Sequence, residues 1–61
     1  MAHITSKELM GLGDQLAVEQ NLVAKFKAYA AVTEDTALKS KYEQIAQKHQ
    51  RHYDELFANV K

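Results

Sequence analysis

The chain has 61 residues, with eight basic and eight acidic side chains that cancel, and it contains no cysteine and no proline. The lack of cysteine excludes disulfides and thiolate metal sites, and the balanced charge lacks the clustered positive footprint of a nucleic-acid-binding protein. No run approaches the roughly 20 apolar residues of a membrane-spanning helix, and the first residues lack the pattern of a signal peptide. We therefore expect a cytoplasmic protein that has neither nucleic acid nor membrane as a partner.

The composition predicts an all-α fold in one domain, 1–61. Strong helix formers such as Ala, Leu, Lys, Glu and Gln dominate the sequence. A chain of this length buries too little surface to be stable without some further support. Since disulfides are excluded, that support would be a metal ion, association with another chain, or both.

The first predicted helix spans about 5–33. Thr5 and Glu8 have the spacing of a capping box, in which each side chain accepts a hydrogen bond from the other residue's free backbone N–H. Residues that follow by threes and fours define one helical face. This face comprises Leu9, Leu12, Leu16, Glu19, Val23, Phe26, Ala30 and Thr33.

The second predicted helix spans about 36–59 and is out of phase with the first. Continuing the first face beyond Thr33 would place an almost entirely polar series inward, so we expect the chain to turn between 33 and 36. Asp35 is a suitable N-cap for the second helix. The face of this helix comprises Leu38, Tyr42, Ile45, His49, His52 and Leu56.

Two helices of this length predict an antiparallel hairpin. A single hairpin leaves one apolar face uncovered, and a two-fold axis that pairs two copies would bury it in a four-helix bundle. We therefore expect a homodimer. The alternative is a hairpin that docks on a different protein.

Three polar residues, Glu19, His49 and His52, interrupt the otherwise apolar faces. At about 1.5 Å per residue, all three lie some 20–26 Å from the turn, so they should face one another across the hairpin. Carboxylate and imidazole ligands suit transition metals such as Fe, Zn or Mn. The sequence therefore predicts a metal site at Glu19, His49 and His52, which dimerisation would double.

A metal-free polar layer is the alternative interpretation of the same residues. A buried carboxylate is costly unless it is paired, and Glu19 could accept hydrogen bonds from His49 or His52. Such a layer would fix the register of the helices, as buried polar residues do in coiled coils. The sequence has no glycine-rich phosphate loop and no hydrolase triad in a plausible order. It therefore favours a protein without enzymatic activity.

Three segments resemble one known family. They are Ile4–Leu9, Asp14–Gln20 and Ala46–Tyr53, the last of which contains the sequence His-Gln-Arg-His. Together they resemble the small spore coat proteins of clostridia and related spore-formers. These are helical hairpins related to the coat F group and, distantly, to the ferritin-like superfamily. The resemblance implies a ferritin-like bundle, a location in the spore coat, and other spore coat proteins as partners.

The ferritin-like metal pattern transfers to this chain with one departure. The resemblance matches Glu19 to the glutamate of the first helix and His52 to the histidine of the Glu-x-x-His motif. His49 stands where that motif has glutamate, and losing this bridging carboxylate argues against a di-iron oxidase centre. The leading hypothesis is a structural or interaction protein, homodimeric and associated with the spore coat. The alternative is a metal-dependent redox or metal-storage protein that uses Glu19, His49 and His52.

Overall fold

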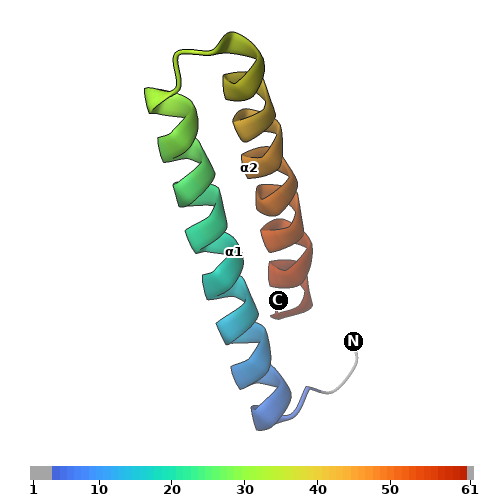
Figure 1. The fold of residues 1–61 in the computed structure, drawn as a ribbon. Coiled ribbons are helices and arrows are strands. Elements are labelled where there is room, and N and C mark those ends of the chain that lie inside the picture. The colour runs from blue at the N-terminus through green and yellow to red at the C-terminus, as the bar shows by residue number, and fades with distance from the viewer. Residues whose placement is uncertain (1–3, 61) are drawn as a thin grey trace.

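The computed structural model describes residues 4–60 and contains two helices that run antiparallel (Figure 1). Helix α1 spans Ser6–Val32 and helix α2 spans Thr36–Phe57, followed by a short 3-10 helix, η1, at Ala58–Val60. The prediction of an all-helical hairpin is confirmed, with the helix bounds within two residues of those expected. Within residues 4–60 there is no strand.

Helix α1 begins with the predicted capping box. The Glu8 backbone N–H donates to the Thr5 hydroxyl at 3.1 Å, and the Thr5 backbone N–H donates to the Glu8 carboxylate at 3.4 Å. The Thr5 hydroxyl also donates to that carboxylate at 2.9 Å. These bonds satisfy backbone donors that the first turn of a helix leaves free.

The turn between the helices is three residues long, 33–35, and needs neither glycine nor proline. Thr33 ends α1 in an extended conformation, and its backbone N–H and its hydroxyl both donate to the Tyr29 carbonyl. Asp35 caps α2 as predicted, because its carboxylate accepts from the Leu38 backbone N–H at 2.9 Å. The side chains of Thr33 and Asp35 therefore replace the backbone partners that both helices lose at the turn.

The hairpin is elongated rather than globular. Its principal extents are 47 × 17 × 11 Å and its radius of gyration is 14.4 Å, against about 10.5 Å for a compact domain of this length. Figure 1 shows the first turns of α1 extending past the end of α2. Within residues 4–60, no helix is both long enough and apolar enough to cross a membrane.

The apolar core is small. Among the described residues, the buried hydrophobic ones are Val23, Ala30 and Ala46. No described side chain is less than 2 % exposed. The chain exposes 4867 Å² in total, whereas a compact protein of 6.9 kDa exposes about 4,000 Å². One hairpin thus leaves roughly 870 Å² more surface in water than a folded monomer of its mass should.

Candidate functional site

Glu19 lies at the centre of the site and is the one polar residue buried among those the structure describes, at 3 % exposure. It projects from α1 toward α2, where His49 and His52 occupy successive turns. His49 Nδ1 lies 3.0 Å from Glu19 Oε1, and His52 Nδ1 lies 2.9 Å from Glu19 Oε2. His49 Nδ1 also lies 3.3 Å from Glu19 Oε2, so both carboxylate oxygens face imidazole nitrogens. The three predicted site residues thus lie together, as their distances from the turn indicated.

The surroundings of Glu19 keep its carboxylate ionised. Burial raises the pKa of the Glu19 carboxyl, because a low dielectric disfavours charge. The hydrogen bonds from His49 and His52, together with the positive charge that these imidazoles carry when protonated, outweigh that effect. The pKa of Glu19 is consequently lower than its ordinary value of 4.5, and the residue is an anion at neutral pH.

An aromatic cluster packs against the site on the side that faces the turn between the helices. The ring of Phe26 stacks on the imidazole of His49 at 6.2 Å between centroids and 11° between planes. Phe26 also contacts Tyr29 edge-on at 5.8 Å and Tyr42 at 6.0 Å. The ring of His49 is thus held by a hydrogen bond at Nδ1 and by an aromatic face, which together restrict its orientation.

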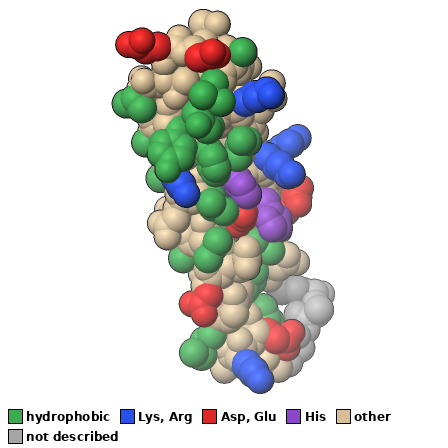
Figure 2. Space-filling model, in the orientation of Figure 1, with side chains coloured by type: hydrophobic (Ala, Val, Ile, Leu, Met, Phe, Trp, Pro, Cys, Tyr) green, Lys and Arg blue, Asp and Glu red, His purple; other side chains and the backbone are tan. Residues whose placement is uncertain are grey.

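The two flanks of the hairpin differ in chemistry. One flank, here called the histidine flank, carries His49 and His52 together with exposed or half-buried hydrophobic side chains from both helices. Figure 2 shows this face, with the two described histidines in purple and hydrophobic side chains in green around and above them. The histidine flank comprises Val18, Leu22, Phe26, Tyr29, Leu38, Tyr42, Ile45, His49 and His52.

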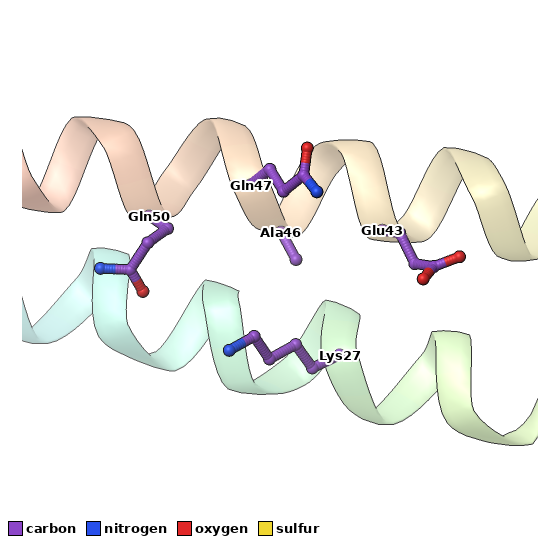
Figure 3. A pocket seen from close by; sticks show the side chains of 5 residues that line it. All are labelled: Lys27, Glu43, Ala46, Gln47 and Gln50. Atoms are coloured by element: carbon purple, nitrogen blue, oxygen red, sulfur yellow. The ribbon is translucent and has the colours of Figure 1, made fainter.

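The opposite flank, here called the glutamine flank, is mainly polar along its middle. It contains an open groove of about 340 Å³ between the helices, with Ala46 at its floor. Figure 3 shows Lys27 reaching into this groove from α1, and Glu43, Gln47 and Gln50 bordering it from α2.

The sequence indicated the three central residues and left open whether Glu19 is a metal ligand or accepts hydrogen bonds from the histidines. The structure places both Glu19 oxygens within hydrogen-bonding distance of imidazole Nδ1 atoms. The stacking of Phe26 on His49 was not predicted. A signal was present, because Phe26 follows Glu19 by seven residues and Tyr42 precedes His49 by seven, which places each pair two turns apart on one face.

Within residues 4–60, no group of three or more His, Cys, Asp or Glu side chains is arranged so that it could hold a metal ion. Comparison of the chain with protein-family models, with curated proteins and with solved structures finds no match. The metal site and the resemblance to ferritin-like spore coat proteins therefore stay predictions.

Proposed function

We propose that the chain is a structural or interaction protein that works as a homodimer, in which two hairpins pair through their histidine flanks to form a four-helix bundle. The observation that carries this proposal is the excess exposed surface of the single hairpin, 4867 Å² against about 4,000 Å² for a compact monomer. A standard protein interface buries about 800 Å² per partner, which is close to that excess.

The histidine flank is the surface that such pairing would cover. Val18, Tyr29 and Leu38 are 49 %, 41 % and 42 % exposed, and Tyr29 belongs to the aromatic cluster. Val18 and Tyr29 are eleven residues apart, about three helical turns, so they form one stripe along α1. A helix that packs along this stripe would complete the core that two helices alone leave open.

A second copy of this chain suits the flank better than an unrelated partner. The chain has no net charge, so two copies do not repel each other through net charge. Glu19 is also the middle residue of α1, with thirteen residues before it and thirteen after it in Ser6–Val32. A two-fold axis through the middle of the hairpin therefore brings the two Glu19–histidine layers together, whichever way the copies run.

In this dimer the Glu19–histidine layer has a structural role. A wrong register or a wrong partner would leave a buried carboxylate and its imidazoles against apolar side chains, which is costly. The layer would thus select the correct pairing, as a buried polar residue does in coiled coils. The location in the spore coat, with other coat proteins as partners, is kept as a proposal on the sequence resemblance.

Sedimentation equilibrium tests the proposal. Between 1 and 100 μM, in the presence of a chelator, we expect the helical protein to sediment with twice the mass of the chain. A protein that stays helical and monomeric over this range would show that the histidine flank is not covered by a second copy.

A further inference from the structure

The hydrogen bonds to Glu19 determine which nitrogen of each histidine is available to a ligand. An ionised carboxylate can only accept hydrogen bonds, so the Nδ1 atoms of His49 and His52 must carry the protons that they share with Glu19. The lone pair of each neutral imidazole is then on Nε2. This is the tautomer that metal binding through Nε2 requires, and carboxylate–histidine–metal arrangements produce it in the same way.

Among the residues that the structure describes, neither Nε2 atom has a hydrogen-bond partner. Within residues 4–60, the hydrogen bonds of the two rings are those that their Nδ1 atoms make with Glu19. The side chain of His52 is 50 % exposed and that of His49 is 26 % exposed. The two residues are three apart on α2, so they lie on neighbouring turns of one face.

The geometry points to a transition-metal site that is shared between two copies of the chain, with the Nε2 atoms of His49 and His52 as ligands. We infer that Glu19 is not a ligand in this site but a positioning residue, which holds both rings through their Nδ1 protons. This inference rests on the proposed dimer, because within residues 4–60 one hairpin supplies only two imidazole ligands and a closed tetrahedral site needs four.

The ligand chemistry selects the class of metal. Imidazole nitrogen suits Zn²⁺, Cu²⁺, Ni²⁺ and iron, whereas Mg²⁺ and Ca²⁺ prefer oxygen ligands. With Glu19 occupied by both imidazoles, no carboxylate oxygen of this layer is left to bridge two iron ions. The site would therefore join two chains and would not resemble a carboxylate-bridged di-iron centre.

Titration of the tag-free protein with Zn²⁺, and with Co²⁺ as a spectroscopic probe, tests the inference. His3, which lies outside the described residues, is replaced by alanine in every variant so that it cannot contribute a ligand. We expect one ion for every two chains, a visible absorption typical of tetrahedral Co²⁺, and a dimer whose dissociation constant rises when the metal is removed, so that it dissociates at a higher protein concentration.

Two variants separate ligand from positioning residue. His52→Gln keeps a donor for Glu19 but lacks the imidazole lone pair, so it should abolish metal uptake. Glu19→Gln should still bind the metal, with an affinity about 10- to 100-fold lower, since loss of a partner that orients a ligand has this effect. If Glu19→Gln abolished binding while His52→Gln did not, the assignment of roles would be wrong.

The same samples distinguish failure of this inference from failure of the proposed function. A chelator-treated protein that is dimeric but takes up neither ion overturns the metal site and leaves the dimer standing. A protein that is monomeric both with and without metal overturns both. Binding of one ion to each chain, with no change in mass, overturns the shared site.

Discussion

Replacing Val18 with serine should weaken the dimer while leaving the hairpin folded. Val18 is 49 % exposed in the single hairpin, and its exposed half lies on the histidine flank. Serine and valine have similar helix propensities, so the substitution changes the surface of α1 more than its stability. The change therefore reports on pairing rather than on folding.

The magnitude follows from the area that remains to be buried. Complete burial of a valine side chain contributes about 1.5–3 kcal/mol, so the exposed half of Val18 accounts for about 1 kcal/mol in each chain. Because a two-fold dimer contains the residue twice, Val18→Ser should cost about 2 kcal/mol of association free energy, which is roughly a 30-fold rise in the dissociation constant.

Sedimentation equilibrium over a concentration series measures this constant, with Met10→Ser as the matched control. Met10 is 72 % exposed and precedes Glu19 by nine residues, about two and a half turns, so it lies on the opposite side of α1. Its replacement should leave the dissociation constant unchanged. Equal effects of the two substitutions, or no effect of Val18→Ser, would refute pairing through the histidine flank.

Three further predictions concern the stability of the hairpin at a fixed protein concentration. Because the pKa of Glu19 is lowered in the fold, the contribution of its ionised carboxylate to the free energy of unfolding is complete above pH 4.5 and is lost as the pH falls through the folded-state pKa. Between pH 6 and pH 3 the melting temperature should therefore fall less for Glu19→Gln than for the native chain. Parallel curves for the two proteins would contradict this. Gly13→Ala should stabilise α1 by about 1 kcal/mol, since a Cβ at Gly13 has nothing within 4 Å; a lower midpoint in urea would reveal a close contact there. Thr5→Ala and Asp35→Ala should each cost about 1 kcal/mol in the same assay, because both caps are present, and unchanged midpoints would mean that the helix ends fray.

The helices themselves could be predicted from the sequence because their signals are local. The capping box at Thr5, the N-cap at Asp35 and the phase break near Thr33 each depend on residues within one or two turns. The level of Glu19 with His49 and His52 also followed from the fixed rise of a helix. These parts of the fold agree with the structure to within about a turn.

The orientation of the rings could not be predicted in this way. Helical spacing places Glu19, His49 and His52 on facing surfaces, but it does not say which nitrogen of each imidazole faces the carboxylate. That depends on side-chain rotamers and on the stacking of Phe26 on His49, which are set by tertiary packing. The sequence therefore left open whether Glu19 is a metal ligand or accepts hydrogen bonds from the histidines, and the structure shows its carboxylate within hydrogen-bonding distance of both rings.

The difference between the two flanks likewise could not be predicted from the helical repeat of apolar residues alone. The faces that contact each other in the hairpin give the strongest periodic signal, and they dominate the pattern of both helices. The stripe that contains Val18 and Tyr29 can be recognised as exposed only once the structure shows which face of α1 is covered by α2. The sequence predicted that a face would remain open, and the structure shows which side chains form it.

Isotope-filtered NMR on a mixed dimer tests the central claim most directly. One copy is labelled with ¹³C and ¹⁵N and the other is unlabelled, so that only contacts between copies are observed. We predict such contacts from the methyl groups of Val18 and Leu22 and from the ring of Tyr29, with none from Lys27 or Gln47. Intermolecular contacts confined to Lys27, Gln47 and their neighbours, or none from the histidine flank, would contradict the account.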